Sequence, residues 1–342
     1  MANLNETDLL VGEGKKFKDL EKSLEAIYGF KIIKTRYPSS VSLTSKKAVL
    51  ETNIGQFFLK EKPLYCSDEL SLQRSFLFQD FCSNSIDCVP KIIKTKTKDF
   101  YFPVGDRKYF LSEYINGRHY NGSEKDIMKM LNVILEINII GQKFLEQERA
   151  RSGVNKKFES YQIATLIPEL DKYVKNEKER QVVADIRKTF HKLSEEYKSI
   201  GNDNFVMAHS DCILFNFIFT DSKAYLIDFD NAKVLPRIHD FAEFFVSATI
   251  LNYLAAIANL KKPVFLSFDK KISKTILNFY REKLKFSGKE FLLFPVVCDI
   301  VWLWTLVLSV IKEDYLIEDL QGAIDVINKK VNRKVIQNTL SS

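Results

Sequence analysis

The sequence of 342 residues lacks the features that mark several classes of protein. It contains no internal repeat and no low-complexity segment, which excludes a repeat protein. Its start, MANLNETDLL, has no basic region before an apolar segment, so we expect no signal peptide. Lys and Arg exceed Asp and Glu by 51 to 44, yet they form no long basic block. We therefore expect no nucleic-acid partner and interpret the charge as a solvated, lysine-rich surface.

The cysteines lack the spacing of a metal site. They number five, at Cys66, Cys82, Cys88, Cys212 and Cys298, and no second close pair follows Cys82 and Cys88. Free thiols in a reducing compartment explain this pattern most simply. We therefore predict a cytoplasmic protein.

Charge is scarce in two apolar stretches near the C-terminal end. Residues 244–260 are uncharged but include Asn252, and residues 292–311 carry only Asp299 as a charged residue. A membrane-spanning helix needs about 20 apolar residues. The interrupting polar residues favour buried helices of a helical core, and we expect no membrane association.

With 27 Phe residues and 342 residues in all, the chain can hold two lobes with separate cores.

The most informative stretch is AHSDCILFNFIFTDSKAYLIDFDNA, at residues 208–232. Two short β-rich runs, residues 215–219 and 224–229, flank a turn at residues 220–223 and predict a hairpin. Asp211, Asn216 and Asp228 stand near its open end, so we expect them to converge. Two carboxylates and an amide oxygen lie close together without penalty only when a cation shares them. The transfer of a phosphoryl group from a Mg²⁺–nucleotide complex uses this set of side chains.

This stretch resembles a known superfamily. The pattern His-x-Asp-x-x-x-x-Asn at residues 209–216, followed by Ile-Asp-Phe-Asp at residues 227–230, is similar to the aminoglycoside phosphotransferase and choline kinase superfamily. Members usually have Gly where Ser210 stands, and choline kinases often have Cys where Cys212 stands. A looser similarity, in residues 28–60, points to the spore-coat kinase-like branch.

The resemblance implies an α+β, two-lobed, protein-kinase-like fold. Residues 1–115 would form a small β-rich lobe that covers the nucleotide. Residues 116–342 would form a larger, mainly helical lobe with the catalytic hairpin and the acceptor site. The implied activity is transfer of the γ-phosphoryl group of ATP, with Mg²⁺, to a hydroxyl of a small-molecule acceptor. The chain would therefore be a small-molecule kinase.

The resemblance also assigns roles to residues of the hairpin. Asp211 would orient and deprotonate the acceptor hydroxyl. His209 would brace the catalytic loop, and Asn216 and Asp228 would bind Mg²⁺. Asp240 is expected to bond to the backbone of the catalytic loop. Arg237 has two interpretations, contact with an anionic substrate or a structural ion pair.

In the N-terminal part, residues 31–35, 48–52 and 56–60 read as strands after a helix at residues 19–28. Lys60, at the end of the third strand, would contact the α- and β-phosphates of ATP. A helix beginning near Ser67 would supply its carboxylate partner. Glu69 and Gln73 are both candidates for that position.

Two further nucleotide contacts follow from the resemblance. Residues 38–42, Pro-Ser-Ser-Val-Ser, would cover the phosphates although they contain no glycine. A strand at residues 109–115 would end at the segment between the lobes, where the backbone of Glu113, Tyr114 and Ile115 meets the adenine.

Several alternatives stay open at the level of sequence. Ser210 in place of glycine, and the uncertain partner of Lys60, leave room for an inactive kinase-like scaffold or binding protein. The scarcity of acidic residues after Asp240, apart from Glu243, argues against an aminoglycoside acceptor. Aromatic residues such as Tyr280 could form a choline-binding cage or simply fill a core. The sequence does not determine the acceptor or the oligomeric state.

Overall fold

A computed structural model describes residues 14–37, 47–62, 69–104, 107–152, 166–201, 204–249, 270–311 and 316–341. The chain divides into two compact units, Met1–Asn116 and Gly117–Ser342, and each is considered separately. The expected phosphate-covering loop at residues 38–42, the expected helix start at Ser67, and Cys66 lie outside the described residues. The second half of the apolar stretch at residues 244–260 lies outside them as well.

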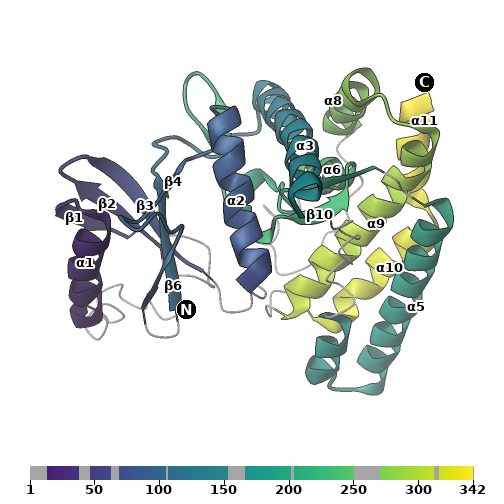
Figure 1. Cartoon of the computed structure of the whole chain (residues 1–342). Helices are drawn as coiled ribbons and strands as arrows, with labels where there is room; N and C mark the ends of the chain where they lie inside the picture. The colour runs from purple at the N-terminus through teal and green to yellow at the C-terminus, as the bar shows by residue number, and fades with distance from the viewer. Residues whose placement is uncertain are drawn as a thin grey trace. The chain divides into compact units, whose positions relative to one another are not determined.

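Within its described residues, the first unit contains a six-stranded antiparallel sheet and two helices (Figure 1). The strand order is β1-β2-β3-β6-β4, and β5 also pairs with β6. The three strands predicted at residues 31–35, 48–52 and 56–60 are confirmed to within one residue at each end. The elements are α1 (Gly14–Tyr28), β1 (Ile32–Arg36), β2 (Lys47–Thr52), β3 (Gly55–Glu61), α2 (Glu69–Ser85), β4 (Ile92–Ile93), β5 (Phe102–Val104) and β6 (Arg107–Glu113).

The two helices of this unit cover opposite faces of the sheet, because side chains alternate along each strand (Figure 1). Leu59 of β3 and Leu111 of β6 are buried in one cluster with Leu24 of α1. The neighbouring residue of β6, Phe110, is buried with residues of α2 in a second cluster. Lys60 is paired with Phe110 across the sheet, so its side chain lies on the α2 face, and it is only 5% exposed.

The second unit is mainly helical, with two short two-stranded sheets, β7 with β10 and β8 with β9. Its longer elements are α3 (Glu124–Ser152), α5 (Glu177–Ile200), β7 (Phe205–Ala208), β8 (Phe217–Phe219), β9 (Ala224–Leu226), β10 (Lys233–Pro236), α6 (His239–Thr249), α8 (Lys270–Phe279), α9 (Gly288–Ile311), α10 (Gln321–Asn328) and α11 (Val331–Ser341). The shorter turns are η1 (Ile167–Tyr173), η2 (Leu214–Asn216), η3 (Phe229–Asn231), a π-helical turn η4 (Tyr280–Leu284) and η5 (Ile317–Leu320).

Helix α9 forms the centre of this unit. The segment Gly288–Leu308 is long and apolar enough to cross a membrane, the one such helix among the described residues, and 72% of its most apolar part is buried inside the structure. It packs against α5 and α6. Its charged residue, Asp299, accepts a hydrogen bond from Arg333 of α11, and Arg333 also donates to Glu196. The prediction that residues 292–311 form a buried core helix is therefore confirmed.

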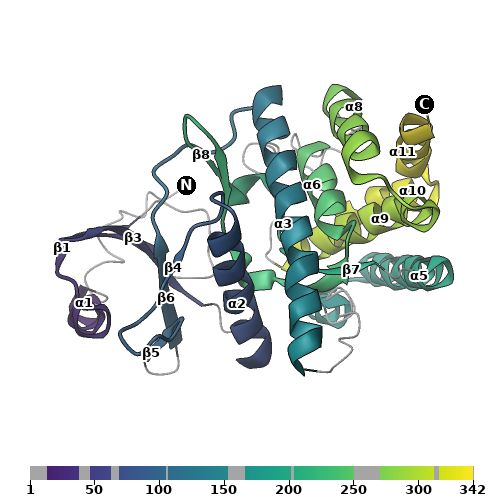
Figure 2. The same ribbon diagram turned by 45° about the horizontal axis from the view of Figure 1, so that its top comes forward.

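Helix α3 approaches β7 unusually closely at Gly141 (Figure 2). A Cβ atom added to Gly141 would overlap the backbone carbonyl group of Met207. Met207 lies two residues before His209. The glycine therefore fixes the distance between α3 and the strand that leads to the loop around Asp211.

We expect Gly141→Ala to lower the free energy of unfolding by about 1 to 3 kcal/mol, because the added methyl group meets rigid backbone. In an ordinary exposed helix the same change stabilises by roughly 1 kcal/mol, so the sign is diagnostic. Gly288→Ala is the control, since nothing lies within 4 Å of its Cβ position. Urea unfolding followed by circular dichroism measures both variants. Equal stability of the two would contradict the close packing of α3 and β7.

Candidate active site

The hairpin predicted around residues 220–223 is present, but its strands are shorter than expected. The strands predicted at residues 215–219 and 224–229 are reduced to Phe217–Phe219 and Ala224–Leu226. A 3-10 turn, Leu214–Asn216, precedes the first strand, and a second turn, Phe229–Asn231, follows the other after Asp228. The prediction was wrong at these ends because the chain forms 3-10 turns there and does not continue as extended strands.

Two hydrogen bonds hold Asn216 between the other two candidate residues. Its Nδ2 donates to the carbonyl oxygen of Asp211 at 2.9 Å. Its own carbonyl oxygen accepts from the backbone N–H of Ile227, also at 2.9 Å, and Ile227 directly precedes Asp228. A carbonyl acceptor requires the amide nitrogen as its partner, so the orientation of the Asn216 amide is fixed. Its Oδ1 is thus the atom with which Asn216 can bind a cation.

The backbone is left-handed at two positions of this site. Ser210 has φ 60° and Asp228 has φ 70°. Residues other than glycine rarely adopt this region, which costs roughly 1–2 kcal/mol, and such residues cluster at functional sites. The conformation of Ser210 explains why relatives of the resembled superfamily usually have glycine there. Ser210 therefore preserves the loop shape despite the departure from that pattern.

Helix α6 anchors the loop around Asp211 through Asp240, which is fully buried. Its Oδ2 accepts from the backbone N–H of His209 at 2.9 Å, and its Oδ1 accepts from that of Ser210 at 2.8 Å. The prediction that Asp240 bonds to the loop backbone is confirmed. Burial raises the pKa of Asp240 to about 6, although the two N–H donors oppose this rise.

Two more residues of α6 continue this anchoring. Glu243 Oε2 accepts from the backbone N–H of Cys212 at 2.6 Å, and Ser247 Oγ accepts from that of Leu214 at 3.2 Å. Together with Asp240 they occupy positions i, i+3 and i+7, which lie on one face of a helix. The sequence analysis missed this role of Glu243 and Ser247. The signal was available as polar residues at that spacing in an otherwise apolar helix, whose side chains are all buried.

Cys212, Asp240 and Glu243 also gather three possible metal-ligand atoms within 4.8 Å. However, both oxygens of Asp240 and one oxygen of Glu243 already accept backbone N–H groups. Burial, followed by repulsion from Asp211 and Asp240, raises the pKa of Glu243 well above its ordinary value. Burial likewise raises the pKa of the Cys212 thiol. Because three of these oxygens already bond to the loop, the cluster anchors the loop.

His209 braces the loop from the opposite direction. Its side chain is fully buried, its Nε2 lies 3.1 Å from the carbonyl oxygen of Ile227, and its ring packs edge-on against Phe229 at 4.5 Å. The ring thus links the loop before Asp211 to the segment that carries Asp228. This geometry matches a bracing role.

Arg237 forms an ion pair with Glu290. Its Nε and Nη2 donate to the two carboxylate oxygens at 2.8 and 2.7 Å, and Glu290 is buried. Of the two interpretations from the sequence, the structure supports the ion pair.

In the first unit, the candidate carboxylate partner of Lys60 is engaged elsewhere. Lys108 donates to one oxygen of Glu69 and the Tyr101 hydroxyl donates to the other. Gln73 also bonds to Glu69, and these contacts, led by that of Lys108, lower the pKa of Glu69. The two candidates therefore belong to one polar group on α2.

At the end of β6, the backbone N–H groups of Glu113 and Tyr114 already donate hydrogen bonds within the first unit. The N–H of Glu113 donates to the carbonyl oxygen of Lys91 at 2.9 Å, and that of Tyr114 donates to Gln56 at 3.4 Å. The Glu113 carboxylate accepts from the N–H of Lys91. Ile115 follows directly after these sheet contacts.

The left-handed conformation of Ser210 generates a prediction about stability. Ser210→Gly should keep the free energy of unfolding within about 1 kcal/mol of the unsubstituted protein, because glycine adopts positive φ without strain. Ser210→Val should lower it by at least about 2 kcal/mol, because a β-branched side chain is strained there. Urea unfolding gives both values. A valine variant as stable as the glycine variant would contradict the conformation.

The raised pKa of Asp240 generates a second prediction. The pKa of Asp240 is about 6 in the folded state, above its value in the unfolded state. At a pH between these two pKa values, the folded state therefore binds more protons than the unfolded state. The contribution of Asp240 to stability is therefore complete at low pH and falls as pH rises, by about 3 kcal/mol between about pH 4 and 7. Urea unfolding across this range, compared with Asp240→Asn, isolates the effect. Parallel pH profiles for the two proteins would show that Asp240 has an ordinary pKa.

Comparisons with known proteins bear on this geometry. The family model described as "Ecdysteroid kinase-like family" matches residues 135–259. None of the curated proteins matches the sequence. An amicoumacin kinase in complex with AMP-PNP, Ca²⁺ and Ami is similar in structure, with a TM-score of 0.66, 13% identity and 96% of each chain covered.

Two more solved structures show the same similarity. A microcompartment-associated aminopropanol kinase has a TM-score of 0.64 and 11% identity, covering 93% of this chain and 99% of its own. A choline kinase from Cryptosporidium parvum Iowa II has a TM-score of 0.55 and 14% identity, covering 98% of each chain. The chain therefore has the protein-kinase-like fold of these structures, with a small β-rich N-terminal part and a mainly helical C-terminal part, as the motif at residues 209–230 led us to expect.

Proposed function

We propose that the chain is a small-molecule kinase that transfers the γ-phosphoryl group of ATP to a hydroxyl of its acceptor, with Mg²⁺ as the metal. The observation that supports this most strongly is the anchoring of the loop around Asp211. Four of its backbone N–H groups bond to Asp240, Glu243 and Ser247. Phosphoryl transfer depends mainly on fixed positions of charged groups, and this loop is fixed from one rigid helix.

In this proposal Asp211 accepts the proton of the acceptor hydroxyl as that oxygen attacks the γ-phosphorus atom. Such general bases contribute about 10²- to 10⁴-fold to the rate. Asp211 is partly exposed, while its neighbours Ser210 and Cys212 are buried and bonded to α6. Its carboxylate can therefore meet a substrate, although its backbone is held in place. Burial raises the pKa of the Cys212 thiol and of the Glu243 carboxyl beside it.

Asn216 and Asp228 are the proposed metal ligands. They offer an amide oxygen and a carboxylate, the hard oxygen donors that Mg²⁺ prefers. Bound there, Mg²⁺ would neutralise the charge on the β- and γ-phosphates. The bond from Asn216 to Asp211 sets the direction of the amide, and the bond from the Ile227 N–H to the Asn216 carbonyl holds the segment before Asp228 beside it. The residues present thus fit a divalent cation.

The nucleotide contacts are assigned to the first unit. Lys60 contacts the α- and β-phosphates, and Glu69 or Gln73 is its proposed partner. Glu69 would then exchange its bonds to Lys108 and Tyr101 for one to Lys60. The backbone of the segment Glu113, Tyr114 and Ile115 meets the adenine. Because the N–H groups of Glu113 and Tyr114 already bond within the sheet, we assign the donor for adenine to Ile115.

The acceptor is proposed only as a class, a small molecule with a free hydroxyl. The similar structures include an aminopropanol kinase, a choline kinase and a Plasmodium vivax ethanolamine kinase. Small amino alcohols are therefore the first acceptors to test, followed by sugars and other hydroxylated metabolites.

The proposal predicts that Asp211→Asn lowers the turnover number at least about 100-fold and leaves the dissociation constant of Mg–ATP within about threefold, because Asp211 acts on the acceptor and not on the nucleotide. Transfer of labelled phosphate from ATP across a panel of acceptors, together with calorimetry of ATP binding, measures both. Asp221→Asn is the matched control, an exposed acid in the turn of the same hairpin.

Unchanged turnover in Asp211→Asn would contradict the role of Asp211. ATP binding without transfer to any acceptor, in the unsubstituted protein, would instead favour the kinase-like scaffold that the sequence left open.

A further inference from the structure

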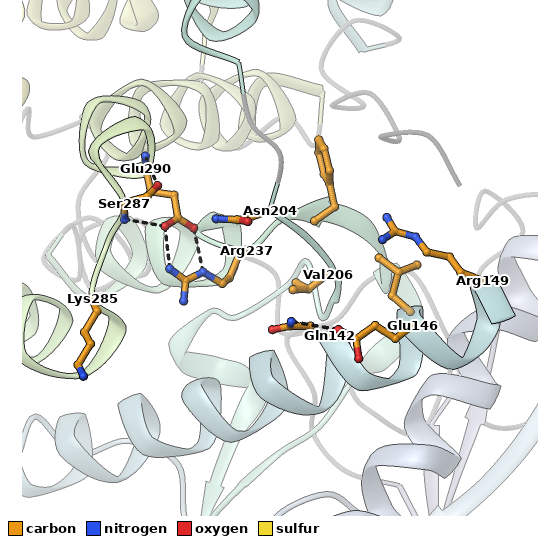
Figure 3. A pocket seen from close by; sticks show the side chains of 11 residues that line it. Gln142, Glu146, Arg149, Asn204, Val206, Arg237, Lys285, Ser287 and Glu290 are labelled. Carbon is orange, nitrogen blue, oxygen red and sulfur yellow. Dashed lines mark hydrogen bonds and ion pairs between the residues drawn. The ribbon is translucent and has the colours of Figure 1, made fainter. Parts of the chain in front are cut away.

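The helical unit contains a pocket of about 370 Å³ (Figure 3), and no residue of the loop around Asp211 lines it. Phe205 and Val206, at the beginning of β7, line it, whereas Ala208 at the other end of this strand leads to His209. On the paired strand, β10, Pro236 lies opposite Phe205. The next residue, Arg237, lines the pocket. The pocket thus lies at the far end of the β7–β10 sheet from Asp211.

One side of the pocket is already saturated with hydrogen bonds. Glu290 accepts from Arg237, from the backbone N–H of Ser287 at 2.9 Å, and from the side chain of Asn204 (Figure 3). On α3, Gln142 donates to Glu146 at 3.1 Å. Arg237 and Glu290 together carry no net charge, whereas Glu146, bonded only to a neutral amide, keeps its negative charge at this wall.

Arg149 of α3 is different. Its side chain extends from α3 toward the beginning of β7 (Figure 3), its Nε is buried, and no hydrogen-bond acceptor contacts that atom within the described part of the chain. A buried donor on a cation is costly to leave unsatisfied, and nearly all such groups in proteins have a partner. Arg149 therefore brings a guanidinium group with an unsatisfied donor to the wall of the pocket.

The rim of the pocket has an unusual backbone and a positive charge. The π-helical turn Tyr280–Leu284 precedes Lys285, which lines the pocket and has φ 46°. Such turns and left-handed residues are concentrated at functional sites. Residues 281–289, REKLKFSGK, contain one Arg and three Lys but only one acidic residue, Glu282. This charge favours the approach of an anion.

We propose that this pocket is a second ligand site, which binds a small metabolite through a compact oxyanion, a phosphate or a carboxylate, held by Arg149. The guanidinium group matches both oxyanions by paired hydrogen bonds. The apolar side chains of Leu145, Phe205 and Val206 give room for a short carbon skeleton beside the anion. The ligand would contact the beginning of the strand that carries the catalytic loop.

NMR spectroscopy of the full chain, labelled with ¹⁵N, tests this site through the Nε–H signal of Arg149. Arg149→Lys removes that signal and so identifies it. Inorganic phosphate and succinate are added separately at constant ionic strength, which distinguishes the two oxyanions. We expect at least one of them to shift the signal in a saturable manner. Phosphate bound at the proposed active site would leave this signal unchanged, so the test does not depend on the proposed function.

Calorimetry with the anion that shifts the signal supplies the second measurement. Arg149→Ala should weaken binding at least about tenfold, as expected for the loss of charge-assisted hydrogen bonds. Arg149→Lys should retain part of the affinity. The matched control, Lys143→Ala, removes one positive charge from an exposed position of α3 outside the pocket and should leave affinity unchanged. No shift with either anion, or equal affinity in Arg149→Ala, would overturn the proposal.

Discussion

The candidate active site depends on one type of interaction, the hydrogen bond from a backbone N–H of the catalytic loop to a side chain of α6. A loop has no regular partners for its backbone groups, and buried N–H groups without acceptors are costly. Asp240, Glu243 and Ser247 supply these acceptors from one helix face. Because a helix is rigid, these bonds restrict the movement of the loop. Asp211 is therefore held in a fixed position although it is partly exposed.

The rest of the helical unit supports this arrangement. Helix α6 is buried along its whole length and packs against α9, whose apolar surface forms the core. Helix α3 meets β7 at Gly141, so the strand that enters the loop is fixed as well. His209 then connects the loop to the segment that carries Asp228. Burial of acids is tolerated here because it raises the pKa of Asp240 and of Glu243, which reduces the charge that the core must hold.

Sequence reasoning predicted much of this site and failed at identifiable places. The spacing of polar residues in two β-rich runs predicted the hairpin and the place of Asn216, because alternation and turn chemistry are local properties. The ends of both strands were wrong, since the chain forms 3-10 turns at Leu214–Asn216 and Phe229–Asn231. Glu243 and Ser247 were missed because their acceptor role depends on how α6 packs against the loop. Periodicity predicted α1 as a helix, but only the structure shows that it covers the sheet face opposite α2.

The central claim is that Asn216 and Asp228, fixed beside the Asp211 loop, bind the divalent metal of a nucleotide complex. Crystals grown with Mn²⁺ and AMP-PNP, measured at a wavelength where manganese scatters anomalously, test this claim most directly. The account predicts an anomalous peak bonded to the Asn216 Oδ1 and to the carboxylate of Asp228, with the phosphates of the nucleotide next to it. A nucleotide bound with its metal away from both side chains would contradict the account.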